Sequence, residues 1–267
     1  EVDFDKLKEE LSGEYIILFR SHWLVANLFD FEKYNEIDVE KIAEKFQQDF
    51  PIIEKKNIQD HQIVIDGAGE NKIGSPRIEP TNLIHEISMI NSKQDQRVKI
   101  SDMFFTYETT NYKTFDDIKK IISPILDFLE TDNQVKRYKR FGIRYINLIN
   151  LPCKNKKELL DWNDYINEEL LSSNNIFGKK ELLQLIHIHN IKSSFNDDII
   201  YTVQSGMPNQ NFPASLMEKN FLIDIDGYSK VLMEKNEIIE MLDDIHNEED
   251  EIFETCIKDE LRRIMNE

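Results

Sequence analysis

The chain has 267 residues and a formal net charge of −18, with 40% hydrophobic and 31% charged residues. The hydrophobic fraction is enough for a sizeable core, and the low numbers of Gly (8) and Pro (7) exclude collagen-like and low-complexity chains. Such an acidic chain is repelled by phosphate backbones and by anionic lipid surfaces. We therefore expect neither a nucleic acid nor a membrane as partner.

The two cysteines, Cys153 and Cys256, supply neither a disulfide framework nor a metal-ligand spacing. They fit a reducing compartment. The opening residues show no basic segment followed by an apolar one, and the longest clean apolar run, "YIILF", is too short to span a bilayer. We therefore expect a soluble, cytoplasmic protein.

The first half of the chain alternates strand patterns with one short helix. One or two strands are predicted between 15 and 29, then a helix at 38–50 whose apolar stripe ends at Pro51. A short strand follows at 61–66. The glycine- and proline-containing stretch 67–82 is typical of a loop, and the next two strands are predicted at 97–101 and 103–109.

The segment 114–132 has the clearest helix pattern. Thr114 and Asp117 resemble a capping box, and Pro124 is expected to kink the helix. The buried stripe is formed by five apolar residues, Phe115, Ile118, Ile122, Ile125 and Leu129. A strand at about 137–150 then closes the first half.

The second half begins with an amphipathic pattern at 156–173, which predicts a helix with Trp162 on its apolar side. Three more strands are predicted at 181–191, 198–206 and 220–227. The chain closes at 236–266 with one long helix or two short ones, because the polar run at 246–250 interrupts the apolar period.

This order of elements predicts an α+β fold with a mainly antiparallel sheet and amphipathic helices packed on it, because strands outnumber helices and do not alternate with them. No change in composition divides the chain. We therefore expect a single unit covering 1–267, although two similar lobes, 1–152 and 153–267, are possible.

Arg144 interrupts an apolar strand, "RFGIRYINLIN". Because both faces of this strand carry apolar residues, it is expected to be central, where a guanidinium needs a partner. Asp224 and Asp226 of "LIDIDG" alternate with buried residues and are the expected partners. We expect a structural ion pair, with a ligand-binding role for Arg144, Asp224 and Asp226 as the alternative. The basic run at 136–144 is interpreted as a solvated strand face.

His187 and His189 lie on one face of a predicted strand, with a spacing that several metal sites use. Together with Asp224 or Asp226 they would form a site with two histidines and one carboxylate. Two ligands on one strand specify little by themselves, and half-buried histidines are the simpler interpretation. No serine-nucleophile motif or phosphate-binding loop is present in the sequence. We expect no cofactor.

Negative charge is concentrated at the end of the chain, where residues 234–267 include 13 acidic and 4 basic side chains. This pattern predicts a helix with one very acidic face. The residues expected to meet a basic protein partner are consecutive, Glu248, Glu249, Asp250 and Glu251.

Several segments together resemble a sporadically distributed family of uncharacterised prokaryotic proteins. They are "FQQDFP", "TYETTNYKTFDDI", "RFGIRYINLI", "LIDIDG" and "LDDIHNEEDEIF". The family pattern has Leu or Ile where this chain has Phe141, and a Leu-His pair where it has Ile245 and His246. The resemblance implies no known activity. A patchy distribution is typical of accessory genes, including those of defence and toxin–antitoxin systems.

Three functional hypotheses remain open from the sequence. The first is a non-enzymatic binding or regulatory protein, for which the resemblance suggests a bacterial defence or toxin–antitoxin system as the setting. The second is a metal-dependent hydrolase that uses His187, His189 and one of the two aspartates. The third is a receptor for a small anion or a nucleotide that uses Arg144.

Overall fold

A computed structural model describes residues 24–31, 39–65, 76–101, 103–132, 135–155, 158–172 and 181–265. Its strands form one nine-stranded sheet in the order β2-β3-β4-β5-β1-β6-β9-β8-β7, and all neighbouring strands are antiparallel. The strands are β1 (Leu24–Phe31), β2 (Ile52–Ile65), β3 (Pro76–Ile90), β4 (Gln96–Ser101), β5 (Phe104–Thr109), β6 (Tyr138–Leu151), β7 (Leu185–Lys192), β8 (Ile199–Met207) and β9 (Lys219–Ser229).

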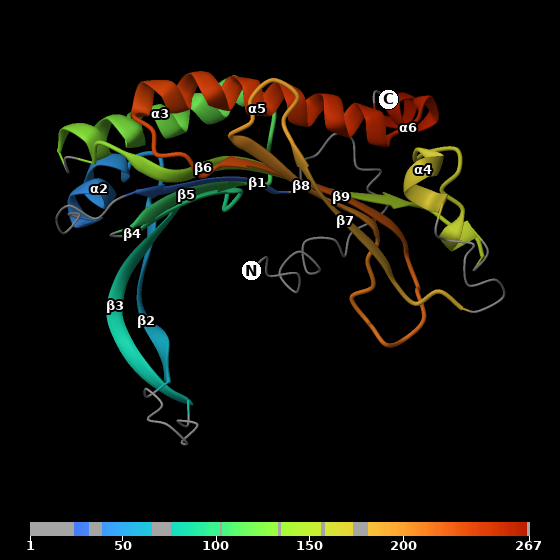
Figure 1. Cartoon of the computed structure of the whole chain (residues 1–267), viewed down its shortest axis with the longest axis horizontal. Helices are drawn as coiled ribbons and strands as arrows, with labels where there is room; N and C mark the ends of the chain where they lie inside the picture. Colours follow the sequence, from blue (N-terminus) through green and yellow to red (C-terminus); the bar gives the residue numbers. More distant parts are fainter. Residues whose placement is uncertain are drawn as a thin grey trace, which may run out of the picture.

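The helices gather on one side of this sheet. Figure 1 shows α3 (Phe115–Thr131) and α5 (Lys235–Cys256) across it, with α2 (Val39–Phe46) at one end. The short helices η1 (Glu158–Leu160), α4 (Glu168–Leu171) and α6 (Asp259–Met265) lie toward the other end. The paired strands β2 and β3 extend away from the helix layer (Figure 1). In the described part of the chain, no helix has the length and apolar character needed to cross a membrane.

The two faces of the central strands differ in composition. On β6, Ile143, Tyr145 and Asn147 are buried under the helices, and we call this side the helix face. Arg140 and Arg144 point to the other side, which we call the ion-pair face. Because side chains alternate along a strand, each residue of β9 and β8 is assigned to one of these faces by its register with β6.

The fold is α+β, as the order of elements predicts. Strands from both halves of the chain belong to the same sheet, and β6 of the first half pairs along its length with β9 of the second. Helix α3 begins at its predicted cap, since the Thr114 side chain accepts a hydrogen bond from the Asp117 N–H, and Pro124 lies inside the helix.

Two predicted elements in the middle of the chain need correction. The loop predicted at 67–82 becomes part of β3 from Pro76 onward, while residues 66–75 lie outside the described residues. The helix predicted at 156–173 is reduced to η1 and α4. Between them Trp162 is fully buried, and its indole N–H donates to the Leu159 carbonyl, so packing is achieved without a continuous helix.

The terminal segment is a long helix followed by a short one, and the break comes later than the polar run suggests. Helix α5 continues through 246–250 and ends at Cys256, before α6 begins at Asp259. Its buried residues continue a helical spacing through the polar run and include one carboxylic acid: Ile238, Leu242, Ile245, Glu249, Phe253 and Cys256. Of the strands predicted between 15 and 29, the part before Leu24 lies outside the described residues.

Candidate functional site

Arg144 and Asp224 form a bidentate ion pair on the ion-pair face. The Arg144 Nε donates to Asp224 Oδ1 at 2.8 Å and its NH2 donates to Oδ2 at 2.7 Å. The Asp224 side chain is 5% exposed and that of Arg144 is 36% exposed. The hydrogen bonds to Asp224 raise the pKa of Arg144 and outweigh the opposing effect of burial. The pair is therefore well placed to hold β6 to β9.

Asp226 lies directly opposite Arg144 in the strand register and also faces Arg140. Its carboxylate is 3.4 Å from the Arg140 guanidinium. Burial raises the pKa of Asp226, and the charges of Arg140 and Arg144 only partly oppose this effect. Two arginines thus face two aspartates, and the local formal charge balances.

Tyr228 completes this network. The Arg140 guanidinium lies 4.6 Å from the centre of the Tyr228 ring, a cation–π distance. Tyr228 pairs with Gly142 across β6 and β9. A Cβ atom at Gly142 would come within 2.7 Å of the Tyr228 Cβ, so the glycine provides the space for the aromatic residue. The "RFGIR" and "DIDGY" segments are therefore complementary halves of one packed arrangement.

The structure brings together Arg144, Asp224 and Asp226, the residues that the sequence singled out for ligand binding. Asp224 occupies two donor positions of the Arg144 guanidinium, Nε and NH2. A ligand anion would have to compete with a nearly buried carboxylate for these donors. The geometry is that of the expected structural pair.

His187 and His189 lie on the helix face, on the opposite side of the sheet from the two aspartates. His187 is in register with Ser205 of β8, and Ser205 with Ile223 of β9, whereas Asp224 points the other way. The alternative site with two histidines and one carboxylate is therefore not assembled. Among the described residues, no group of three or more His, Cys, Asp or Glu could hold a metal ion.

The acidic residues predicted to meet a partner are only partly available. Glu249 is 1% exposed, and its Oε1 accepts a hydrogen bond from the Gly227 N–H at 2.8 Å. Burial raises the pKa of Glu249 well above its usual value. Its assignment to the partner surface is therefore corrected: the helical spacing turns it toward the sheet, where it holds α5 against β9.

The neighbours of Glu249 point in different directions. Glu248 accepts hydrogen bonds from the Ser194 N–H and hydroxyl at 2.8 and 2.7 Å, which ties α5 to the β7–β8 connection. Asp250 is half-buried, and Glu251 is exposed. Only part of the predicted run therefore faces solvent.

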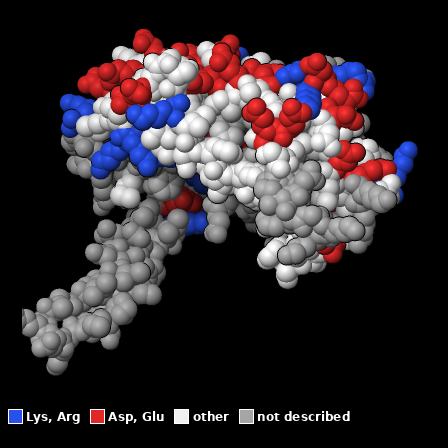
Figure 2. Space-filling model, turned by 45° about the vertical axis from the view of Figure 1, so that its right-hand side comes forward, with Lys and Arg blue, Asp and Glu red and all other residues white. Residues whose placement is uncertain are grey.

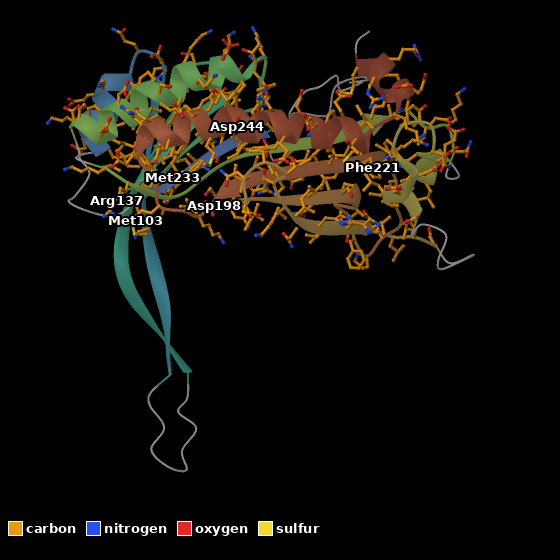
Figure 3. The ribbon with its side chains drawn as sticks, turned by 45° about the horizontal axis from the view of Figure 1, so that its top comes forward. Met103, Arg137, Asp198, Phe221, Met233 and Asp244 are labelled. Atoms are coloured by element: carbon orange, nitrogen blue, oxygen red, sulfur yellow. The ribbon has the colours of Figure 1, made fainter. Side chains whose placement is uncertain are left out.

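The exposed side of α5 carries four acids at spacings of three, four and seven residues, and only Glu251 among them belongs to the predicted run. We call Glu237, Glu240, Asp244 and Glu251 the acidic stripe. Figure 2 shows acidic side chains along the helix layer, and Figure 3 labels Asp244 on α5. The sequence interpretation missed the stripe because it grouped acids by adjacency, although the period of Ile238, Leu242 and Ile245 indicates which positions face outward.

Two lysines of the helix layer are already paired with acids outside the stripe. Lys119 contacts Asp116 and Asp243 at 3.0 and 2.6 Å, and Lys235 contacts Asp127 and Glu130. Within the described ranges, Glu240, Asp244 and Glu251 have no lysine, arginine or histidine at ion-pair distance. Their charge is therefore not compensated by close pairing there.

Aromatic residues connect the helices to β6. Tyr145 Oη and His246 Nδ1 are 2.9 Å apart, and the His246 ring stacks on Phe115 of α3 at a centroid distance of 4.6 Å. The Tyr112 ring meets Tyr145 edge to face. His246, which belongs to one segment of the family resemblance, thus connects α5, α3 and the sheet.

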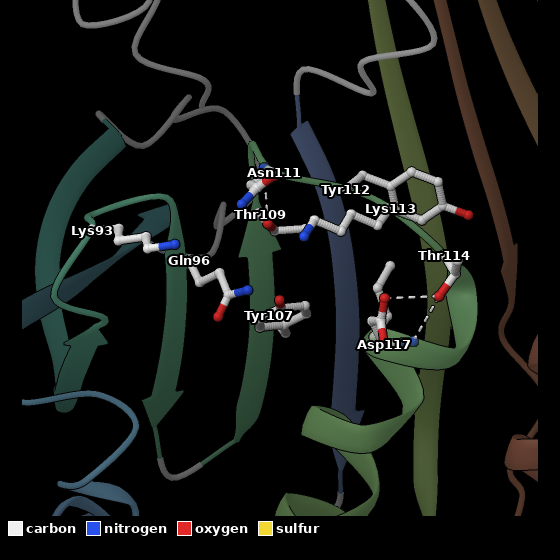
Figure 4. Close-up of a pocket in the computed structure, with 10 residues that line it drawn as sticks. Lys93, Gln96, Tyr107, Thr109, Asn111, Tyr112, Lys113, Thr114 and Asp117 are labelled. Carbon is white, nitrogen blue, oxygen red and sulfur yellow. Dashed lines mark hydrogen bonds between the residues drawn. The ribbon is translucent and has the colours of Figure 1, made fainter.

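A pocket of about 310 Å³ opens where the β4–β5 pair meets the start of α3 (Figure 4). Its lining includes Gln96, Tyr107, Thr109, Lys93 and Lys113. Burial raises the pKa of Tyr107 to about 12. In the described part of the chain neither lysine has a carboxylate within 4.0 Å, so both could meet a ligand. The sequence interpretation did not single out this pocket: most of its lining belongs to the segment 106–118, which was noted only for the resemblance and for its strand and helix patterns, and Lys93 and Gln96 are brought to it by the pairing of β4 with β5.

Comparison with known proteins gives no relative: no protein-family model matches the chain, and no curated protein or solved structure is significantly similar to it.

Proposed function

We propose that the chain is a non-enzymatic binding protein that presents the acidic stripe of α5 to a cationic protein partner. The observation that carries the proposal is the uncompensated negative charge on the outer side of this helix. Helix α5 has nine acidic residues and one basic residue, and most of the ion pairs in the helix layer involve acids outside the stripe.

The helix is held rigidly, which favours binding. Its inner side packs on the sheet, Glu249 is bonded to Gly227, and Glu248 is bonded to Ser194. A surface that is already ordered loses little conformational entropy when a partner docks. From Glu237 to Glu251 the stripe runs about 21 Å, at 1.5 Å per residue, a length suited to a basic helix or an extended basic segment.

Charge complementarity of this kind raises association rate and selectivity more than it raises affinity. Such a partner would suit a component of a prokaryotic defence or toxin–antitoxin system, the setting that the resemblance implies. The two arginines of the ion-pair face support the binding surface indirectly, because they hold together the strands on which α5 rests.

The test is a capture experiment with matched charge changes. In one variant Glu240, Asp244 and Glu251 become Lys, and in the control Asp161, Asp198 and Glu218, which are exposed away from the stripe, become Lys. We expect the first variant to lose a basic partner that the wild type and the control both retain. With the purified pair, its association rate should fall about 10-fold or more, and the wild-type rate should fall with added salt.

The result is decisive in both directions because the two variants have the same net charge. Equal recovery of the partner by both variants would show that the acidic stripe does not bind it. Loss of binding in both would show a general charge effect and would also overturn the proposal.

A second candidate function is binding of a small anion in the pocket beside α3. The specific observation is that Lys93 and Lys113 line this pocket together with polar side chains such as Gln96 and Thr109 (Figure 4). The volume of about 310 Å³ lies at the lower end of the range for small-molecule sites. This location differs from the Arg144 site that the sequence suggested, where Asp224 already occupies the guanidinium.

A thermal-shift titration with inorganic phosphate, nucleotides and small carboxylates tests this candidate. A ligand that binds only the folded state stabilises it by about 2.7 kcal/mol at 100 times its Kd. We expect the shift to disappear in a Lys93→Ala/Lys113→Ala variant and to persist in an Arg144→Lys variant. No shift with any of these ligands at millimolar concentration would reject the candidate.

A further inference from the structure

Strand β7 is an end strand of the sheet and carries exposed apolar side chains. In the described part of the chain it pairs with β8 alone. Three isoleucines of this strand are solvent-exposed: Ile186 is 37% exposed, Ile188 61% and Ile191 42%. Edge strands are normally protected by central charges, prolines or bulges. Here the one formal charge is Lys192, at the end of the strand, so the edge is suited to pairing with another strand.

His187 and His189 lie side by side on this strand. Their ring centroids are 6.3 Å apart and the ring planes differ by 30°, so the two imidazoles project in similar directions from the helix face. Two imidazoles are half of a tetrahedral zinc site. Within the described residues no third ligand completes the set. In the described part of the chain the site therefore has two of the four ligands that zinc prefers.

A second copy of the chain would supply the other two ligands by symmetry. Two identical strands that pair antiparallel are related by a two-fold axis perpendicular to the sheet, so both copies keep their helix faces on the same side. The axis must pass between a residue and the same residue of the other copy. Centring it on Ile188 uses almost the whole strand and places like residues opposite one another: Leu185 meets Ile191, and His187 meets His189.

We propose that two copies of the chain pair through β7 in this register and bind a divalent metal ion of the zinc class with four imidazoles. Directly opposite side chains in an antiparallel pair have Cβ atoms about 4.5–5.5 Å apart. His187 and His189 of each copy then form a compact rectangle on the helix face. Neutral imidazole is a common ligand of Zn²⁺, and four of them satisfy its tetrahedral preference.

The metal also addresses the main obstacle to self-association. Each chain carries a formal net charge of −18, so two copies repel one another at long range. A dication at the contact offsets part of this repulsion where the chains meet. Ile188 packs against its own copy on the opposite side of the paired strands, which adds apolar contact to the metal ligation.

The first measurement is the mass of the full chain in solution by sedimentation, with Zn²⁺ added and then removed by a chelator. We expect a zinc-dependent dimer with one zinc ion for two chains. A His187→Asn/His189→Asn variant should lose both the bound zinc and the dimer. A His246→Asn variant, which changes the histidine that contacts Tyr145 of β6 and Phe115 of α3, should retain both.

The second measurement tests the register by disulfide trapping in a Cys153→Ser background, since Cys256 is buried. In the proposed dimer Ile188→Cys lies opposite itself, within the reach of a disulfide. Asn190→Cys lies opposite Ile186, and its two copies are about 14 Å apart, beyond that reach. We expect zinc to promote cross-linking of the Ile188→Cys variant alone.

Four outcomes overturn the proposal. They are a monomer at every zinc concentration, a dimer that the chelator leaves intact, one zinc ion bound per chain, and preferential cross-linking through Asn190→Cys. None of these outcomes depends on the acidic stripe, so the proposed function and this proposal can fail separately.

Discussion

Both faces of β6 and β9 contain buried polar groups, but these groups are stabilised in different ways on the two faces. On the helix face the partners are an imidazole, a backbone amide and a backbone carbonyl: Tyr145 pairs with His246, Glu249 accepts from Gly227, and Asn147 donates to Ile223. On the ion-pair face, Arg144 and Asp224 neutralise each other and remain partly solvated. A covering helix favours neutral hydrogen-bonded groups, whereas access to water lets charges persist in pairs.

The two faces also influence each other through the sheet. Burial is the main reason that the pKa of Glu249 is raised, but the negative charges of Asp226 and Asp224 raise it further. Asp224 and Asp226 therefore stabilise the positive charge of the arginines on the ion-pair face and disfavour a negative charge on Glu249 on the helix face. This contrast can be tested by changing one face at a time.

The largest effect is expected at the contact between α5 and β9 on the helix face. A Cβ atom at Gly227 would lie 2.6 Å from Tyr201 Cε1, 2.8 Å from Glu249 Oε1 and 2.8 Å from Ile245 Cγ2. Because Tyr201 and Ile245 are fully buried, they have little room to move. We expect Gly227→Ala to lower the free energy of unfolding by about 3 kcal/mol, measured by urea denaturation.

The matched control for this change is Asn247→Ala, on the exposed side of α5, which should stay within about 0.5 kcal/mol of the wild type. Equal effects of the two substitutions would mean that α5 does not depend on close contact with β9.

A smaller effect is expected on the ion-pair face. Arg144→Ala leaves the nearly buried Asp224 without its partner, which costs 3–5 kcal/mol in fully buried pairs. Because the Arg144 side chain is 36% exposed, we expect about 2 kcal/mol here. Replacing both residues, as Arg144→Met with Asp224→Leu, should bring stability to within about 1 kcal/mol of the wild type. A double variant that is less stable than Arg144→Ala would show that the charges do more than neutralise each other.

Much of the pairing between β6 and β9, and the position of α3, follows from the spacing of apolar and polar residues in the sequence. The alternation in "RFGIRYIN" and "LIDIDG" predicted that Arg144 meets an aspartate, because two central strands offer few other partners for a buried cation. The apolar stripe and the Thr114 cap predicted the position and the buried side of α3 closely. These features are local, or depend on one pairing of strands.

Features that depend on several elements at once were not predictable in the same way. Pro76 and Pro80 are typical of a loop, yet β3 is extended because it pairs along its length with β2. Trp162 is buried between short helices, not on a continuous helix. Glu249 looks like a surface residue by type, and only its spacing from Leu242 and Ile245 indicates otherwise. The register of β7, β8 and β9 places the histidines and the aspartates on opposite faces of the sheet, which the separate strands could not indicate.

The contrast between the helix face and the ion-pair face is tested most directly by a substitution that removes the ionisable group of Glu249 and changes little else. Glu249→Gln keeps an oxygen to accept the hydrogen bond from Gly227 and cannot ionise. The folded-state pKa of Glu249 is raised above its ordinary value of 4.5, so the folded chain holds this proton to higher pH than the unfolded chain does. The resulting stabilisation is complete below the unfolded pKa and is lost as pH rises toward the folded pKa.

We therefore expect wild type and Glu249→Gln to have similar stability near pH 4, and the variant to become progressively the more stable as pH rises. The difference in unfolding free energy should grow by at most about 1.4 kcal/mol per pH unit. Urea denaturation of both proteins from pH 4 to 7 measures it, and groups common to both cancel in the difference. A difference that does not change with pH would mean that Glu249 ionises as readily when folded as when unfolded. The helix face would then tolerate a buried charge, and the contrast with the ion-pair face would be lost.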